Sequence, residues 1–144
     1  MSLIPLDKYV DIVKDLPILC ADIVLQNTRG EYLLIKRNNE PLKDEWWVIG
    51  GRVLKGETME EAAIRKVKQE TGLQIKNMRP IGSFELVNGT NPFGLPFKYH
   101  SVSIVFSAVI DSQQSIKLDD QSVEFKFAKE LPADFIVQPF GNKS

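Results

Sequence analysis

The sequence predicts an α/β domain in which a β-sheet is combined with one dominant helix. Short apolar segments typical of strands outnumber segments with helical periodicity, and one strongly capped helix interrupts them. The chain of 144 residues is long enough for one domain with its own core. No repeat or low-complexity linker divides residues 1–144. Because strands outnumber helices and one strong helix interrupts them, the pattern favours an α+β fold or an α/β/α sandwich.

The first third of the chain predicts a helix followed by strands. Pro5 suits a first helical turn, Pro17 ends the helix, and apolar residues between them share one face: Leu6, Tyr9, Val10 and Val13. Residues 18–26 and 31–36 then predict a hairpin with its turn at 27–30. After a polar loop, the next elements are a strand at 45–49, a break at Gly50-Gly51 and a short extended segment at 52–54.

The clearest helix in the sequence follows the two glycines. Thr58 is a natural N-cap, and Glu61 three residues later completes a capping box. The helix is expected to reach Thr71, with Gly72 just past its end. Strands are expected near 80–86, 97–110 and 123–128, with a turn-rich loop at 88–96, and residues 129–144 are expected to hold a short helix.

Charge and composition exclude several classes of function. The formal net charge of −1 and the lack of a basic stripe argue against a nucleic-acid partner. The one cysteine, Cys20, lies in an apolar run and is expected to be a small core residue. No run approaches the roughly 20 apolar residues of a membrane span, and no signal peptide is evident. We therefore expect a cytoplasmic protein with no membrane partner.

One face of the capped helix combines small apolar residues with a carboxylate. Ala63, Val67 and Glu70 lie within about 60° of one another at 3.6 residues per turn. If this face packs on the sheet, Glu70 is held rigidly and suits Mg²⁺, which takes oxygen ligands. The alternative is that the carboxylates of this region, Glu57, Glu60, Glu61 and Glu70, form a solvated helix face.

Residues 51–73 resemble the Nudix box. The box residues Gly51, Glu57, Arg65, Val67, Glu70, Gly72 and Leu73 fix seven positions over 23 residues, so chance agreement is improbable. The resemblance implies a Nudix α/β/α sandwich with a mixed β-sheet, in which a loop–helix–loop binds divalent metal and a diphosphate. Two carboxylates of the box are replaced, by Lys66 and Gln69, which leaves Glu70 alone of the three.

The wider sequence is similar to the GDP-mannose mannosyl hydrolase branch of that family, from about Pro17 to Phe127. The resemblance covers Asp22, residues 27–37, the aromatic pair before the glycines, and Gly50 to Val53. It implies that water attacks the glycosyl carbon of a nucleoside-diphosphate sugar and releases the nucleoside diphosphate. It also implies one Mg²⁺ as cofactor, with Mn²⁺ as an alternative, and a homodimer.

The same resemblance implies roles for individual residues. Gly50, Glu70 and Gln121 match metal ligands, and Arg37 and Arg52 match arginines at the diphosphate. Asp22 matches an acidic residue close to the sugar, and Arg65 is expected to orient Glu57 or Glu70. Each has a simpler alternative: Asp22 and Arg37 as strand-end residues and Gln121 as a loop residue. Trp46 and Trp47 are expected in the core and the pocket wall.

The general base is the main departure from that branch. Ser122 follows Gln121, where the mannosyl hydrolases have a histidine, and a serine hydroxyl alone cannot take a proton from water near neutral pH. Glu124 and Asp120 are candidates if their pKa is raised. His100, the only histidine, is a third candidate, although a structural role is the simpler expectation for it.

Three functions therefore remain open. The first is a nucleotide-sugar hydrolase that cleaves at the glycosyl carbon, with Asp22, Arg37, Arg52 and Glu124 as its catalytic set. The second is a pyrophosphatase that attacks phosphorus with a carboxylate from elsewhere, such as Glu57 or Glu124. The third is a nucleotide-sugar binder that has lost the base. A fourth hypothesis, hydrolysis of RNA caps, is less well supported because the sequence shows no basic face.

Overall fold

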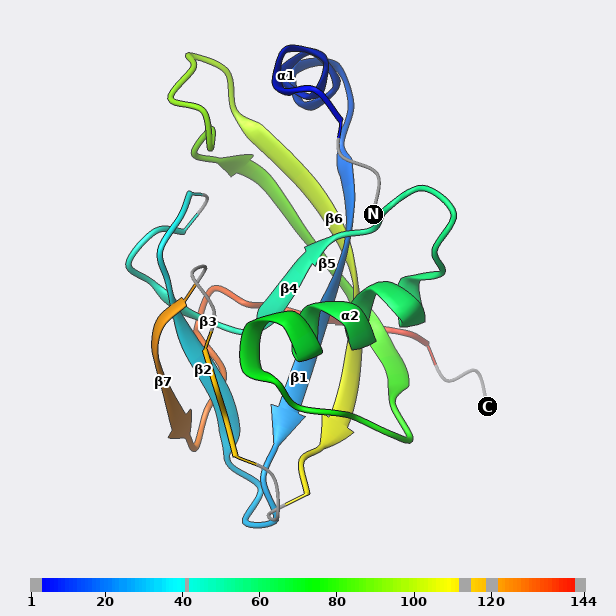
Figure 1. The fold of residues 1–144 in the computed structure, drawn as a ribbon, viewed down its shortest axis with the longest axis vertical. Helices are drawn as coiled ribbons and strands as arrows, with labels where there is room; N and C mark the ends of the chain where they lie inside the picture. Colours follow the sequence, from blue (N-terminus) through cyan, green and yellow to red (C-terminus); the bar gives the residue numbers. More distant parts are fainter. Residues whose placement is uncertain (1–3, 41, 112–114, 119–121, 142–144) are drawn as a thin grey trace.

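The computed structural model describes residues 4–40, 42–111, 115–118 and 122–141, and for Ser122 and Val123 their backbone only. Two helices accompany a mixed sheet in this part of the chain (Figure 1). The helices are α1 (Leu6–Asp15) and α2 (Met59–Thr71). The strands are β1 (Ile18–Gln26), β2 (Tyr32–Arg37), β3 (Trp46–Trp47), β4 (Ile49–Arg52), β5 (Arg79–Gly89), β6 (Tyr99–Val109), β7 (Ser122–Ala128) and β8 (Gln138–Pro139).

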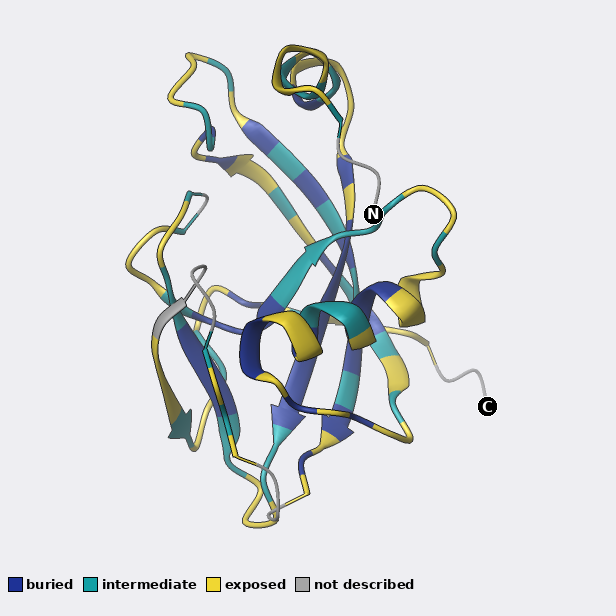
Figure 2. Cartoon of the chain, viewed as in Figure 1, coloured by how far each residue is buried: buried dark blue, intermediate teal, exposed yellow. Residues whose placement is uncertain are grey.

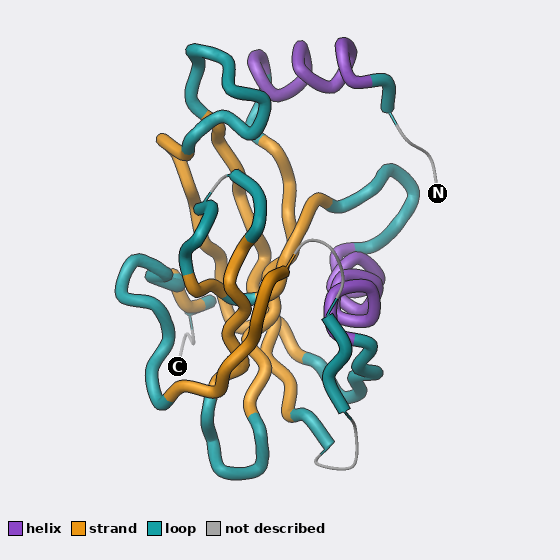
Figure 3. The backbone as a smooth tube through the Cα atoms, turned by 60° about the vertical axis from the view of Figure 1, so that its left-hand side comes forward, coloured by secondary structure: helices purple, strands orange, loops and turns teal. Residues whose placement is uncertain are grey.

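Strand β1 organises the sheet. It runs parallel to β6 from Ile18↔Ser101 to Gln26↔Val109 and antiparallel to β4. The strand order is β3-β2-β1-β6-β5-β8, with β4 paired to β1 and β7 paired to β2. Helix α2 covers one face of this sheet, and α1 lies at one end (Figure 3). The predicted α/β/α sandwich with a mixed sheet is confirmed.

The predicted hairpin is confirmed at its turn, but its strands separate. The side-chain oxygen of Asn27 accepts hydrogen bonds from the amides of Arg29 (3.0 Å) and Glu31 (2.9 Å), which fixes the turn. The register of β1 with β2 is a single pair, Gln26↔Tyr32. Further along, the same edge of β1 pairs with β4, while β2 pairs with β3 and β7. The sheet therefore opens between β2 and β4.

Two expectations about local structure are wrong. Gly50 and Gly51 do not break a strand, because both lie within β4 and pair with Asp22 and Ala21; the interruption falls instead at Val48. The described part of residues 129–141 contains the strand β8 and no helix. The ring of Phe135 is buried against Trp47 and Phe84, at 5.4 and 5.0 Å between centroids, which holds this segment across the sheet.

Helix α2 is fixed at both ends as the sequence predicts. Thr58 Oγ1 accepts from the Glu61 amide (3.1 Å), and Glu61 Oε1 accepts from the Thr58 amide (2.9 Å). Gly72 adopts φ 74°, a left-handed conformation that glycine adopts without steric cost, and its amide donates to the Lys68 carbonyl. These caps set where the helix begins and ends, and so where Glu70 lies.

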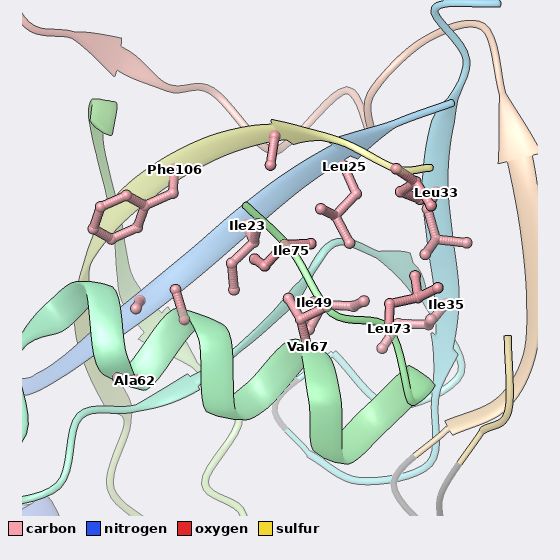
Figure 4. Close-up of a cluster of buried hydrophobic side chains, with 14 residues drawn as sticks. Ile23, Leu25, Leu33, Ile35, Ile49, Ala62, Val67, Leu73, Ile75 and Phe106 are labelled. Atoms are coloured by element: carbon pink, nitrogen blue, oxygen red, sulfur yellow. The ribbon is translucent and has the colours of Figure 1, made fainter. Parts of the chain in front are cut away.

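The buried face of α2 packs on the main core (Figure 4). Ala62, Ala63 and Val67 are fully buried, and Glu70 shares their face. The residues that they meet from the sheet and the segment after α2 are Ala21, Ile23, Leu25, Leu33, Ile35, Ile49, Leu73, Ile75, Phe106, Ala108 and Ile110. The central strands are accordingly buried along most of their length (Figure 2). The solvated-face alternative is therefore excluded for Glu70.

Two smaller clusters complete the interior. The opposite face of the sheet carries Val24, Leu34, Trp47, Val48, Phe84, Val105 and Phe135. Helix α1 packs Val13 against Ile18, Cys20 and Tyr99 at the end of β1 and β6. Cys20 is buried, as expected for a small core residue. In the described part of the chain, neither helix has the length and apolar character needed to cross a membrane.

We expect Val67→Ala to lower the free energy of unfolding by about 2 kcal/mol, because it removes two buried methyl groups between α2 and the sheet and leaves a cavity. Ile64→Ala, on the exposed side of the same helix, is the matched control and should change stability by less than about 0.5 kcal/mol. Urea unfolding with an unchanged m-value would measure both. Equal losses would contradict the burial of this face.

Candidate functional site

Two adjacent hollows meet at the twin glycines of β4. The inner hollow is lined by Cys20, Asp22, Arg37, Leu42, Trp47, Val48, Gly50, Gly51, Arg52, Phe84, Leu86, Tyr99, Ser101 and Ser103. The outer hollow is lined by Tyr9, Arg37, Glu40, Gly50, Gly51, Arg52, Lys66, Glu70, Pro92, Phe93 and Tyr99. They share Arg37, Gly50, Gly51, Arg52 and Tyr99. One ligand can therefore reach both sides of β4.

Strand alternation decides which side chains reach the inner hollow. Successive residues of a strand point to opposite faces, so Cys20 and Asp22 share one face of β1. On the neighbouring strand β6, Tyr99, Ser101 and Ser103 share that same face and line the hollow. Ala21 and Ile23 point the other way, into the core beneath α2. The inner hollow therefore receives polar side chains from β1 and β6, beside the apolar side chains of Trp47, Val48 and Phe84.

The twin glycines make room on both faces of β4. A Cβ at Gly50 would overlap Asp22 Oδ1, so the Asp22 carboxylate lies directly over this glycine. A Cβ at Gly51 would lie 2.5 Å from Lys66 Cε, on the α2 side. Any other residue would displace either the carboxylate or the lysine. The two glycines therefore fix how closely Asp22 and Lys66 approach the strand.

Helix α2 presents Lys66 and Glu70 to the outer hollow. The side chain of Glu70 is 2% exposed and that of Lys66 is 18% exposed, with 3.7 Å between Glu70 Oε2 and Lys66 Nζ. This distance describes an ion pair that is too long for a hydrogen bond. A carboxylate buried this deeply needs a compensating cation, and Lys66 supplies one.

A second ion pair ties the loop before α2 to the helix. Arg65 Nη2 and Nε donate to the two carboxylate oxygens of Glu57 at 2.7 and 3.1 Å, and Nη2 also donates to the Arg52 carbonyl at 3.0 Å. The bonds from Arg65 lower the pKa of Glu57. Arg65 thus holds Glu57 and the backbone of β4, which is the orienting position expected from the sequence.

Asp22 is the buried carboxyl group among the residues that line the inner hollow. Burial raises its pKa to about 6, while a hydrogen bond from Ser103 and the charge of Arg37 act in the opposite direction. A carboxyl group with this pKa can exchange a proton near neutral pH. Asp22 therefore combines burial, a ligand-accessible position and a pKa suited to proton transfer.

Aromatic side chains border the two hollows near α1. The Arg52 guanidinium lies 4.9 Å from the centre of the Tyr9 ring, and Tyr9 meets Phe93 edge to face at 5.8 Å. Burial, followed by the nearby Asp22 carboxylate, raises the pKa of the Cys20 thiol to about 12. The thiol is thus a neutral wall residue, while Tyr9 holds the Arg52 guanidinium in position.

The structure brings together most of the residues expected from the sequence. Asp22, Arg37, Gly50, Arg52 and Glu70 all line the paired hollows. Trp47 lines the inner hollow and belongs to the core, as expected. Gln121 and Asp120, expected as a metal ligand and a possible base, lie outside the described residues.

Glu124 and His100 are not brought to this set. The side chain of Glu124 is 58% exposed on β7 and lies 3.8 Å from Lys36 Nζ. His100 follows Tyr99 on β6, so strand alternation turns it to the opposite face, and it lines neither hollow. Of the titratable side chains lining the inner hollow, Asp22 is the carboxyl group placed to accept a proton.

Sequence reasoning missed several residues of the site. The sequence pattern places Tyr9 on a helix face, Tyr99 and Ser103 in a strand and Phe93 in a loop, and it indicates no role for any of them. The alternation of Tyr99, Ser101 and Ser103 along β6 was a usable signal, because small polar residues on one face of an apolar strand indicate a polar surface. No comparable pattern in the sequence predicts that α1 packs at this end of β6.

The oxygen donors fit one hard cation better than a metal cluster. Glu70 offers a carboxylate and Gly50 a backbone carbonyl, and both residues line the outer hollow. Among the described residues, no group of three or more His, Cys, Asp and Glu side chains is placed to hold a metal. Phosphate oxygens of a ligand would have to supply further donors.

A mixed sheet, a glycine-rich strand and a capped helix with a buried glutamate define an α/β protein in which β4 and helix α2 together border a hollow. The sequence profile of the NUDIX domain matches residues 17–139. The chain belongs to the Nudix family, whose hydrolases generally use divalent metals such as Mg²⁺ or Mn²⁺.

Two named relatives are similar over most of this chain. The low-salt glycan biosynthesis protein Agl8 of Haloferax volcanii is 32% identical over 124 residues, which are 85% of this chain and 78% of that protein. The ADP-ribose pyrophosphatase of Methanocaldococcus jannaschii is 35% identical over 117 residues, which are 81% of this chain. The match spans 65% of that second protein, slightly under two thirds of its length.

Solved structures share the fold. The MutT protein of Methanosarcina mazei superposes with a TM-score of 0.67 at 26% identity and covers 83% of this chain and 88% of its own. The NUDIX domain of Shewanella oneidensis NrtR, complexed with ADP ribose, gives a TM-score of 0.64 at 18% identity and covers 87% of this chain and 83% of its own. At that second identity the likeness concerns the fold alone.

We expect Asp22→Asn to stabilise the protein at neutral pH. Because the folded-state pKa of about 6 lies above the usual value of 3.8, stability from the protonated carboxyl is fully present below about pH 4 and is lost as pH rises through 6. The variant should match the wild type near pH 4 and exceed it at pH 7 by an amount on the order of 3 kcal/mol.

Urea unfolding at a series of pH values would measure this difference. Asp11→Asn, on the exposed side of α1, is the control and should follow the wild-type profile. A stability difference that does not vary between pH 4 and 7 would contradict the description of Asp22.

Proposed function

We propose that this protein hydrolyses a nucleoside-diphosphate sugar, of the GDP-mannose type, at the glycosyl carbon and releases nucleoside diphosphate and free sugar. The observation that carries the proposal is the division of the site by β4: one buried carboxylate, Glu70, lies on the α2 side, and another, Asp22, lies on the opposite side. Glu70 suits the diphosphate end of a substrate. Asp22 suits the end where water attacks.

The substrate class is supported by the chemistry of the hollows and by the named relatives. Arg37 and Arg52 line both hollows, and guanidinium groups bind phosphate oxygens in a forked geometry. One relative is named for glycan biosynthesis and another as an ADP-ribose pyrophosphatase. The second name specifies a substrate in which a diphosphate is joined to a sugar, and the first is compatible with a sugar-containing substrate.

The residues of this chain divide the reaction between them. Arg37 and Arg52 bind the diphosphate and stabilise the negative charge that grows as the glycosyl C–O bond breaks. Asp22 accepts the proton of the attacking water, whose oxygen forms the new bond to the glycosyl carbon. The electron pair of the broken bond leaves with the nucleoside diphosphate. Ser103 holds the Asp22 carboxylate by a hydrogen bond.

A divalent cation, Mg²⁺ or Mn²⁺, fits this scheme at Glu70 and Gly50, both of which line the outer hollow. The resemblance implies Gln121 as a further ligand, and that residue lies outside the described part of the chain. When bound, the cation acts as a Lewis acid that makes the diphosphate a better leaving group. The assignment of Asp22 as proton acceptor replaces Glu124 in the scheme, because Glu124 is exposed and pairs with Lys36. A homodimer, as in the resembled branch, remains a prediction.

The second candidate is a pyrophosphatase that attacks phosphorus. The 35% identity to an ADP-ribose pyrophosphatase favours it. Against it, the described residues hold no carboxylate cluster beside Glu70, and Glu57 is occupied by Arg65. The third candidate is a nucleotide-sugar binder, which would bind the nucleotide sugar without hydrolysing it.

Product analysis in H₂¹⁸O distinguishes the three functions. With GDP-mannose, GDP-glucose, GDP-fucose or ADP-ribose plus Mg²⁺, we expect a nucleoside diphosphate and free sugar, with the ¹⁸O in the sugar. The measurement is ³¹P NMR combined with mass spectrometry of the sugar. A nucleoside monophosphate, a sugar phosphate and label on phosphorus would instead establish the pyrophosphatase. Binding by calorimetry with no product over hours would favour the binder.

We expect the kcat/KM of the active substrate to fall as pH drops below about 6, because protonated Asp22 cannot accept a proton. Asp22→Asn should lower kcat/KM by about 100-fold or more and abolish this acidic limb. Asp11→Asn should leave both the rate and the profile unchanged. An acidic limb that persists in Asp22→Asn would assign the proton transfer to another group.

A further inference from the structure

Lys66 occupies a position where the family pattern has a carboxylate, and its surroundings are built around it. Its stem passes Gly51, where a Cβ would lie 2.5 Å from Lys66 Cε and 3.2 Å from Nζ. The lysine therefore reaches the edge of β4 only because residue 51 has no side chain. This close fit distinguishes Lys66 from a solvated lysine on a helix surface.

The ammonium group of Lys66 is held at the mouth of the outer hollow. The side chain is 18% exposed, and its ion pair with Glu70 is 3.7 Å long. Because an ammonium has three N–H donors and this pair is too long for a hydrogen bond, the group keeps donors for a ligand in the hollow it lines.

The charges lining the outer hollow favour an anion. Three cationic side chains, Arg37, Arg52 and Lys66, face two carboxylates, Glu40 and Glu70. Lys66 comes from α2, whereas the two arginines come from β2 and β4, so the cations approach from different elements. Such an arrangement surrounds a ligand that carries more than one negative charge, as a diphosphate does.

We propose that Lys66 is a diphosphate-binding residue whose ammonium takes the place of a second metal ion beside Glu70. The lysine removes a carboxylate ligand from the site and supplies a fixed positive charge at the same point. The site then needs one divalent cation at most, and it binds a diphosphate with measurable affinity without any metal. This inference rests on the proposed function only in taking a diphosphate as the ligand.

The test uses pyrophosphate and Mn²⁺ as separate probes. In EDTA, calorimetry should show that Lys66→Met weakens pyrophosphate binding by roughly 10- to 100-fold, the range expected for loss of one charge-assisted contact. Lys66→Arg, which keeps the charge, should bind within about threefold of the wild type. Lys68→Met, which removes an exposed lysine two residues away on the same helix, should bind as the wild type does.

Metal binding tests the second half of the proposal. Lys66→Glu restores a carboxylate beside Glu70, so its affinity for Mn²⁺, measured by electron paramagnetic resonance without nucleotide, should rise about 10-fold. Lys68→Glu makes the same change of charge on the exposed side and should leave the affinity unchanged. An unaltered Mn²⁺ affinity in folded Lys66→Glu would overturn the metal-replacement role.

A measurement on the wild-type protein covers the case in which the variants do not fold. Pyrophosphate in EDTA should protect Lys66 from acetylation by acetic anhydride at least about fivefold, with Lys68 as internal control in the same mass spectrum. Equal labelling of Lys66 with and without pyrophosphate, or failure of the wild type to bind pyrophosphate in EDTA, would overturn the diphosphate-binding role. None of these results depends on which bond the enzyme cleaves, so they fail separately from the proposed hydrolysis.

Discussion

The pairing of Gly50 with Asp22 across β4 and β1 is the constraint on which the site depends. Since directly opposed residues of an antiparallel pair point to the same face, a side chain at residue 50 would occupy the space of the Asp22 carboxylate. One residue later, the same strand is open toward Lys66. Both faces of β4 are therefore reachable by a ligand, and α2, β1 and β6 can all contribute to one site.

Burial and charge act together around this strand. Asp22 is desolvated among Cys20, Ser103 and the aromatic residues of the inner hollow, and this environment brings its pKa toward neutrality. Glu70 is buried even more deeply, but it has Lys66 beside it. Two carboxylates on opposite sides of one strand are thus given different electrostatic settings, which is the usual way in which similar groups acquire separate roles.

Short sequence motifs predict the features of the fold that depend on neighbouring residues. The capping box of Thr58 and Glu61 and the glycine that ends α2 could be predicted because each depends on residues within about two helical turns. The sequence leaves two alternatives for Glu70, and the packing of α2 on distant strands decides that it is buried. The set of Asp22, Arg37 and Arg52 came from resemblance, and the structure places these residues together. The separation of β1 from β2, the position of α1 and the path of residues 129–141 depend on contacts between distant segments. No short pattern specifies the burial of Phe135 between Trp47 and Phe84.

Strand β8 has a consequence for how the molecule meets its neighbours in solution. It lies at one end of the strand order and pairs with β5 at Ser83↔Gln138 and Gly82↔Pro139. Proline has no amide hydrogen, so this two-residue strand offers a poor template for the backbone of another chain. A short strand that ends in proline thus protects the middle of β5 from pairing with a further strand. The same C-terminal segment also carries Phe135 into the core.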